Sequence, residues 1–147
     1  MAEVARRAGV GMATLYRNFP GRPELLDALF ADEVDVICQA AADGEDFVSW
    51  LRRNFAFARG KRAVAADLLG PGYTPGTDMS GAALPSRRGK AIEAGRPLLA
   101  RAQTAGEIRD DLSLEQIFDL IVAIATAPGD DAYHKPMLET LLDGLRR

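Results

Sequence analysis

Side chains suited to contacting duplex DNA are concentrated between residues 12 and 22. Thr14, Tyr16 and Asn18 carry a hydroxyl, a phenol and an amide, which are neutral groups that hydrogen-bond phosphate oxygens. Arg17 can donate two hydrogen bonds to the edge of a guanine, and small or apolar side chains can contact a thymine methyl group. The candidate DNA-binding residues are Met12, Ala13, Thr14, Tyr16, Arg17, Asn18 and Arg22.

Two short helices are needed to present these side chains. The pattern predicts a helix over 2–8 that ends at Gly9 and a second helix over 12–18. Gly9 can adopt a positive φ and turn the chain sharply, and the small Ala5 allows the two helices to approach closely. The residues expected to point inward are Val10, Leu15 and Phe19. This arrangement is a helix-turn-helix, whose second helix enters the major groove. The alternative is an ordinary helical hairpin with a solvated polar face.

The segment VARRAGVGMATLYRNFPGRPELLDALF, residues 4–30, resembles the DNA-binding signature of the tetracycline-repressor (TetR) family. This resemblance implies that Met12, Ala13 and Arg17 face the bases. It implies phosphate contacts for the other candidates, which are Thr14, Tyr16, Asn18 and Arg22. It also implies an all-α fold, with a helix-turn-helix region over 1–30 and a helical ligand-binding and dimerisation domain over 31–147.

Family members carry one more helix before this motif, and the sequence lacks it. We therefore expect four side chains to lose cover: Val4, Ala8, Leu26 and Leu29. The main hypothesis is a transcriptional repressor that binds a palindromic operator as a homodimer and is released by a small molecule. The alternative is a helical ligand-binding and dimerisation protein that does not bind DNA as given, because the first helix is absent.

The charge distribution fits a DNA-contacting end on an acidic body. The net charge is −3, yet residues 1–22 hold four arginines against Glu3 alone. One positive end on an acidic protein is compatible with phosphate contact, whereas a basic coat over the whole molecule is excluded.

Other classes of function receive no support from the residues. Cys38 is the only cysteine, so an internal disulfide is impossible, and we expect its thiol to be buried and structural. His134 is the only histidine, and we expect it at the surface rather than in a metal or catalytic site. No cofactor motif, catalytic constellation, signal peptide or membrane span is apparent, so the predicted class is a cytoplasmic non-enzyme.

The remainder reads as further helices with no strand. One helix is expected from about Pro23 to residue 42. Two separate helices are expected over 46–59 and 61–69, divided at Gly60, and a loop over 70–78. A helix over about 84–105 should kink or break at Gly95 and Pro97. Helices over 114–127, capped by Ser113 and Gln116, and over 131–146 complete the chain.

The helical body offers candidates for a ligand pocket and for an interface between two copies. The resemblance to the TetR family implies a ligand cavity in this helical body, and the candidates for its lining are Trp50, Asn54, Phe57, Leu68, Met79 and Leu84. Plain core packing is the alternative for each of them. The last two helices are apolar over much of their surface, which favours burial against a second subunit. The interface candidates are Ile117, Leu120, Ile121, Ile124, Met137, Leu138, Leu141 and Leu145, the alternative being a helix central to its own subunit.

Overall fold

A computed structural model describes the backbone of residues 1–69 and 83–147 and the side chains of 1–67 and 87–147. These residues form seven α-helices and no strand beyond a single bridge between Ile108 and Arg146. The helices are α1 (Ala2–Ala8), α2 (Met12–Asn18), α3 (Arg22–Ala42), α4 (Phe47–Leu69), α5 (Ala83–Thr104), α6 (Leu114–Thr126) and α7 (Asp131–Leu145). The all-α prediction is confirmed.

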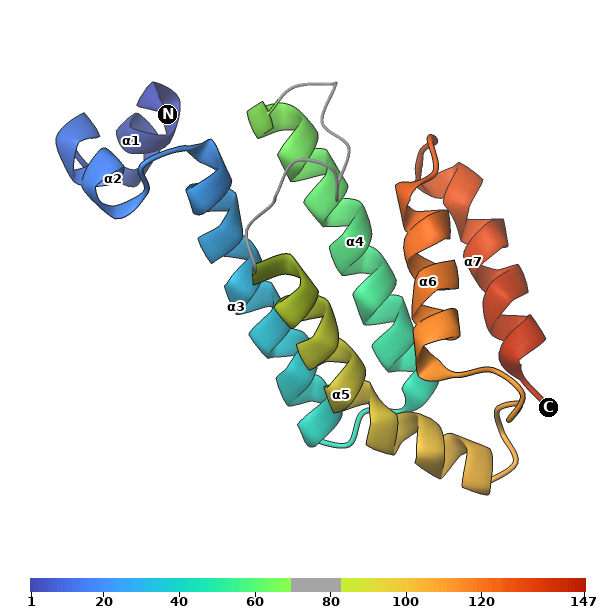
Figure 1. The fold of residues 1–147 in the computed structure, drawn as a ribbon. Coiled ribbons are helices and arrows are strands. Elements are labelled where there is room, and N and C mark those ends of the chain that lie inside the picture. Colours follow the sequence, from blue (N-terminus) through green and yellow to red (C-terminus); the bar gives the residue numbers. More distant parts are fainter. Residues whose placement is uncertain (70–82) are drawn as a thin grey trace.

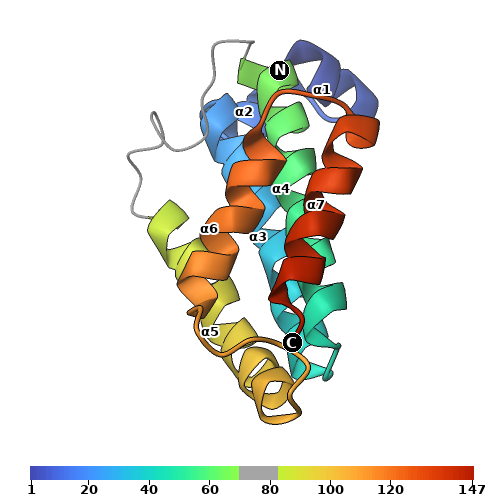
Figure 2. The same ribbon diagram turned by 90° about the vertical axis from the view of Figure 1, so that its right-hand side faces the viewer.

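The helices form a small pair joined to a larger bundle. Figure 1 shows α1 and α2 at one end, beside the start of α3, while α3 to α7 make the body. Within the body, α3 packs on α4 and α5, α6 packs on α4, α5 and α7, and Figure 2 shows α6 and α7 running side by side. α3 passes through residue 30 without interruption and therefore links the helix pair directly to the bundle core.

Most helix ends are set by local sequence. Ser113 accepts a hydrogen bond from the Gln116 backbone N–H, and the Gln116 side chain accepts one from the Ser113 N–H, so the predicted capping box is present. Asp46 similarly accepts from the Ser49 N–H at the start of α4. Gly21 occupies the N-cap of α3, and Pro23 lies in its first turn, where its missing N–H removes no helical bond.

Two of the predicted interruptions are absent. α4 continues through Gly60, so the expected division into two helices is wrong. An exposed glycine costs a helix only about 1 kcal/mol, and Val64 and Ala65 beyond it pack with Phe30 of α3. α5 contains Pro97 and bends partway along (Figure 1), which is the predicted kink, although it remains one helix.

The core is centred on Trp50, which is fully buried. Its ring stacks on Phe47 and packs against Phe118, each with ring centroids 6.2 Å apart, and its Nε1 donates to the Ile37 carbonyl over 3.2 Å. A bulky residue fits here because Gly95 of α5 has no side chain: a Cβ at that position would lie 2.3 Å from the ring. Trp50 therefore couples α3, α4, α5 and α6 at one point.

His134 is buried, which makes the predicted surface position wrong. Its Nδ1 lies 2.6 Å from the Asp130 carbonyl oxygen and its Nε2 lies 2.9 Å from the Ala127 carbonyl oxygen. The ring thus lies within hydrogen-bond distance of two backbone carbonyls at the connector between α6 and α7. Sequence spacing alone did not reveal this position. Cys38 is half-buried, its Sγ lies 3.7 Å from the Lys90 carbonyl oxygen, and burial raises the pKa of its thiol.

Candidate nucleic-acid interface and ligand cavity

The turn between α1 and α2 is built on Gly9. This residue has φ of 67°, and the N–H of Val10 donates to the Ala5 carbonyl over 3.1 Å, closing the end of α1. Glycine adopts this left-handed conformation without the steric cost that other residues pay. Ala5 and Leu15 are buried between the two helices, as expected. Val10 is 40% exposed, so the expectation that it fills the angle is wrong, because the turn directs its side chain outward.

All seven candidate DNA-binding residues lie on the exposed surface at this end of the molecule. Tyr16 is 46% exposed and Met12 is 40% exposed, while Leu15 between them on α2 is buried and fixes the orientation of the helix. The Asn18 Nδ2 donates to the Thr14 carbonyl over 2.9 Å, which closes the last turn of α2. The outer face of α2 therefore presents one arginine, one phenol and small polar groups together.

The charges of α1 are arranged differently from those of α2. Glu3 accepts hydrogen bonds from the Nε atoms of Arg6 and Arg7, each over 2.8 Å. These bonds hold the pKa of the Glu3 carboxyl below its usual value. All three side chains are exposed, so such pairs contribute little stability. Arg17 forms no comparable ion pair with any described residue. Its guanidinium is available to an external acceptor.

Of the four side chains near this end that we expected to lose cover, some are exposed and others are not. Ala8 is exposed and Leu29 is 48% exposed, whereas Val4 is half-buried. Leu26 is fully buried, contrary to expectation, because it packs with Phe30 and Ala65 between α3 and α4.

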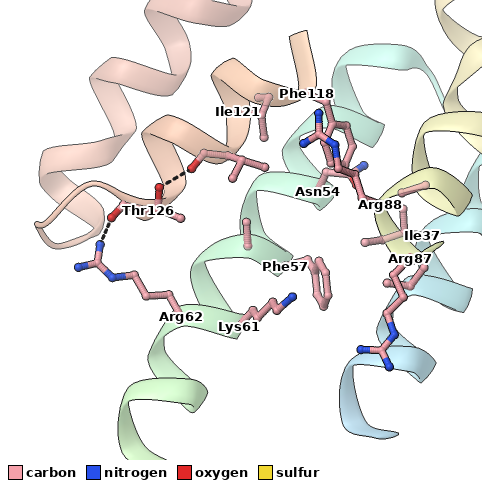
Figure 3. Close-up of a pocket in the computed structure, with 14 residues that line it drawn as sticks. Ile37, Asn54, Phe57, Lys61, Arg62, Arg87, Arg88, Phe118, Ile121 and Thr126 are labelled. Carbon is pink, nitrogen blue, oxygen red and sulfur yellow. Dashed lines mark hydrogen bonds between the residues drawn. The ribbon is translucent and has the colours of Figure 1, made fainter. Parts of the chain in front are cut away.

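A cavity of about 270 Å³ lies in the body between α3, α4, α5 and α6. Most of its wall is apolar, with Ile37, Phe57, Phe118 and Ile121 among the lining residues. Asn54 is buried in this wall and donates its Nδ2 to the Trp50 carbonyl over 2.8 Å. Figure 3 shows Lys61 beside Phe57 and Arg88 beside Phe118, while the side chains of Arg62 and Arg87 extend toward the edges of the space.

Four cations line the same cavity, and none of the described lining residues is acidic. They are Lys61 and Arg62 of α4 and Arg87 and Arg88 of α5. Arg62 turns toward the end of α6 and donates to the carbonyls of Thr126 and Ala127 (Figure 3). These carbonyls belong to a helix C-terminus, where a cation is favoured.

The two cavity-lining arginines of α5 differ in how many of their donor groups are hydrogen-bonded. Arg88 pairs with Asp119 at 2.6 Å and lies over the Phe118 ring, 5.4 Å from its centroid. Arg87 forms an ion pair with Asp27 of α3, but its Nη1 is buried without a hydrogen-bond partner. An unsatisfied buried donor is costly and uncommon in folded proteins. Arg87 therefore retains bonding capacity inside the protein.

Lys61 is the cation of the cavity with the weakest compensation. Its Nζ lies 5.1 Å from the centroid of the Phe30 ring, and no ion pair joins it to a described carboxylate. Burial lowers the pKa of this ammonium, nearby Arg87 lowers it further, and Asp27 partly opposes both effects. The cluster formed by Lys61, Arg87 and Asp27 carries two positive charges and one negative charge.

The predicted pocket residues are only partly brought together. Asn54 and Phe57 line the cavity. Trp50 does not: it is fully buried in the core, so its assignment to the pocket is corrected. Met79 and the side chains of Leu68 and Leu84 lie outside the described residues. The basic lining residues were missed, although the doublets at 61–62 and 87–88 were visible signals in the sequence.

The predicted interface residues divide into two groups. Ile117, Ile121, Leu138 and Leu145 are buried in the core of the single subunit, so they cannot present surface to a second copy. The other four, which are Leu120, Ile124, Met137 and Leu141, are exposed or half-buried on α6 and α7. We call these four residues the outer α6–α7 face. The internal alternative was therefore correct for the first group.

Two other kinds of feature, a membrane-spanning helix and a metal-binding cluster, are absent from the described residues. No helix there is long and apolar enough to cross a lipid bilayer. No group of histidine, cysteine and acidic side chains in those ranges could hold a metal ion.

Comparison with known proteins identifies both parts of the chain. Residues 1–29 match the model for bacterial regulatory proteins of the tetR family, and residues 42–147 match the model for the transcriptional regulator SbtR-like C-terminal domain. No curated protein gives a significant match.

Solved structures agree with the family models. The TetR transcriptional regulator SCO0520 from Streptomyces coelicolor is 32% identical, with a TM-score of 0.67, over 97% of this chain and 85% of that one. The TetR transcription regulatory protein from Mycobacterium vanbaalenii is also 32% identical, with a TM-score of 0.58, over 99% of this chain and 81% of that one. The resemblance of residues 4–30 is thus confirmed: this chain belongs to the TetR family of transcriptional regulators, which are DNA-binding factors and not enzymes.

Proposed function

We propose that this regulator is a repressor that binds a palindromic operator through the outer face of α2. The observation that carries the proposal is the exposure of Tyr16 and Arg17, which directly follow buried Leu15 on α2. A helix anchored by one face and polar on the other can lie in a major groove, with Arg17 toward the bases and Tyr16 toward a phosphate. Arg22 adds a cation at the N-terminus of α3, and a helix N-terminus favours anions.

A homodimer would provide the second recognition helix. The outer α6–α7 face is the proposed interface, since Ile124, Met137 and Leu141 line a shallow apolar groove on these neighbouring helices. Leu120 of α6 is 42% exposed. Two such faces would form a four-helix contact, which is a common way for helical subunits to pair. The two recognition helices would then need a spacing of about 34 Å to occupy successive major grooves.

The cavity between α3 and α6 is the proposed site of a small-molecule effector. It is bounded by α3, whose first residues follow α2 directly, so a ligand that prefers a different position of α3 would alter DNA affinity. The change in affinity is limited to the difference in ligand affinity between the two arrangements.

The DNA assignment is tested with an operator selected from random duplexes by this chain. Tyr16→Ala should weaken binding to all sequences equally, because a phosphate contact carries no base information. Arg17→Ala should weaken binding and also reduce discrimination at one base pair, by about 1–3 kcal/mol. Arg101→Ala, an exposed arginine in the last turn of α5, is the control and should change neither. Operator affinity that ignores both α2 changes would reject the assignment and favour a protein that does not bind DNA.

The dimer is tested by sedimentation equilibrium. Leu120→Asp should convert the protein to a monomer, because a carboxylate would be buried without a partner at the interface. Val36→Asp changes an exposed apolar residue of α3 and should leave the mass unaltered. A dimer that survives the change at Leu120, or one lost only in the Val36 control, would place the interface elsewhere.

A further inference from the structure

We propose that the effector of this regulator is an amphipathic anion, with its acidic group held by Lys61 and Arg87 and its apolar part in the cavity. This inference rests on the proposed function, because it names the chemical class of the effector. It follows from the charges of the cavity wall, which the family assignment does not specify.

The electrostatic balance of the site favours an anion. The four lining cations have two carboxylate partners among the described residues, Asp27 on Arg87 and Asp119 on Arg88. Arg62 is satisfied by the carbonyls at the end of α6. Lys61 forms no ion pair with a described carboxylate, and burial and Arg87 both act against its ammonium, which Asp27 offsets only in part. A ligand anion next to Lys61 would supply the missing negative charge.

Arg87 offers a second point of attachment for the same group. Its Nη2 pairs with Asp27, while its Nη1 is buried and has no hydrogen-bond partner. A guanidinium can hold two acceptors on different nitrogens. A change of the Arg87 side-chain rotamer that exposes Nη1 to the cavity would let a ligand oxygen bond it while Asp27 keeps Nη2. Hydrogen bonds between ionised groups are stronger than neutral ones, which favours a carboxylate over an alcohol.

The rest of the wall determines the other half of the ligand. Phe57, Phe118, Ile121 and Val122 present carbon atoms and no charge. The volume of about 270 Å³ lies just below the range of about 300–1,000 Å³ typical of small-molecule pockets. The site therefore suits a small acid with an alkyl or aryl body better than a nucleotide or a sugar.

The probes are octanoate, 4-phenylbutanoate and hexyl phosphate, compared with neutral 1-octanol and cationic octylamine by calorimetry on the full chain. We expect at least one acid to bind at least tenfold more tightly than 1-octanol, and octylamine to bind more weakly than either. The acid that binds best identifies whether the body is alkyl or aryl and whether the acidic group is a carboxylate or a phosphate. Equal affinity for acid and alcohol, or no binding of any acid up to about 10 mM, overturns the proposal.

Variants locate the acidic group. Lys61→Gln and Arg87→Gln should each weaken acid binding at least tenfold while leaving 1-octanol within twofold. Arg87→Lys keeps a charge opposite Asp27 and should retain the fold and lose part of the affinity, which guards against misfolding of the glutamine variant. Lys90→Gln removes an exposed cation of α5 that does not line the cavity and should change nothing. Acid affinity unaltered by the changes at both Lys61 and Arg87 overturns the proposal.

Failure of the anion proposal can be distinguished from failure of the DNA-binding proposal. If the acid binds and operator affinity falls, both stand. If the acid binds but operator affinity is unchanged, the anion is not the effector and this inference is rejected while DNA binding remains. If the chain does not bind any selected DNA, the proposed function fails, whereas calorimetry still reports the ligand preference of the cavity.

Discussion

Gly95→Ala is the substitution for which the structure predicts an effect opposite to the usual one. Replacing a glycine inside a helix by alanine normally stabilises by about 0.5–1 kcal/mol. At Gly95 the new Cβ would lie 2.3, 2.7 and 2.9 Å from three carbons of the Trp50 ring. Carbon atoms pack best about 3.5–4.0 Å apart, so the ring would have to move by about 1 Å.

The surroundings of Trp50 oppose that movement. The ring is fully buried, stacked on Phe47, packed on Phe118 and tied by its Nε1 to the Ile37 carbonyl. Overpacking of this kind costs about 1–3 kcal/mol, which exceeds the gain in helix propensity. Subtracting the propensity gain leaves a net loss of up to about 2.5 kcal/mol. With about 2–4 °C of Tm for each kcal/mol in a chain of this size, Gly95→Ala should lower the Tm by up to about 10 °C.

The matched control is Gly89→Ala in the same helix, because a Cβ at Gly89 meets nothing within 4 Å. It should raise the Tm by about 1–4 °C. Both melts are followed by circular dichroism at 222 nm, at one protein concentration, since association shifts apparent stability. In the Gly95→Ala background, Trp50→Phe should cost less than in the wild type, because the smaller ring relieves the overlap. A rise in Tm for Gly95→Ala equal to that of Gly89→Ala would refute this account of the packing.

Three other outcomes can be measured directly. Ser113→Ala should lower the free energy of unfolding by about 1 kcal/mol in urea melts, because the hydroxyl that accepts the Gln116 backbone N–H is lost. The control is half-buried Ser49→Ala, which should cost less because the Ser49 backbone N–H keeps its bond to Asp46. Lys61→Met should raise the Tm at neutral pH, since it removes a charge that burial disfavours. Because the folded-state pKa of Lys61 is lowered, wild-type stability should rise with pH between that pKa and the ordinary lysine value. The stability advantage of the methionine variant should shrink over the same pH range. Because the pKa of Lys61 is lowered, octanoate affinity measured by calorimetry should begin to fall below the pH at which an ordinary lysine loses its proton. An affinity that stays constant up to the ordinary lysine pKa would contradict the role of Lys61.

Local features of the fold were predictable because their causes lie within a few residues. Gly9 turns the chain because it adopts a positive φ, and Ser113 caps α6 through a neighbour three positions away. The alternation of buried Leu15 with exposed Tyr16 follows directly from helical spacing. These short-range causes define the end of α1, the start of α6 and the exposed face of α2.

Features that depend on distant contacts were not predictable in the same way. α4 continues past Gly60 because Val64 and Ala65 pack on α3, and a single sequence does not show that contact. His134 was expected outside, yet the carbonyls of Ala127 and Asp130 hold it inside. The interface candidates were assigned by apolarity, which does not distinguish Ile117, buried in its own subunit, from Leu120, which is exposed.

The charge of the cavity was missed because it depends on contacts between distant residues as well as on local sequence. Lys61 and Arg87 are 26 positions apart on different helices, and only the packing of α3, α4 and α5 brings them to one cluster with Asp27. Asp27 lies near the start of α3, the helix that follows α2. On the proposed function, an anion that engages Arg87 would alter the strength of the contact between α5 and Asp27, and hence the position of α3. A neutral ligand filling the same volume would lack this effect, because it carries no charge to compete with Asp27 for the guanidinium. On this proposal the charge of the effector, rather than its bulk, links occupancy of the cavity to the orientation of Tyr16 and Arg17.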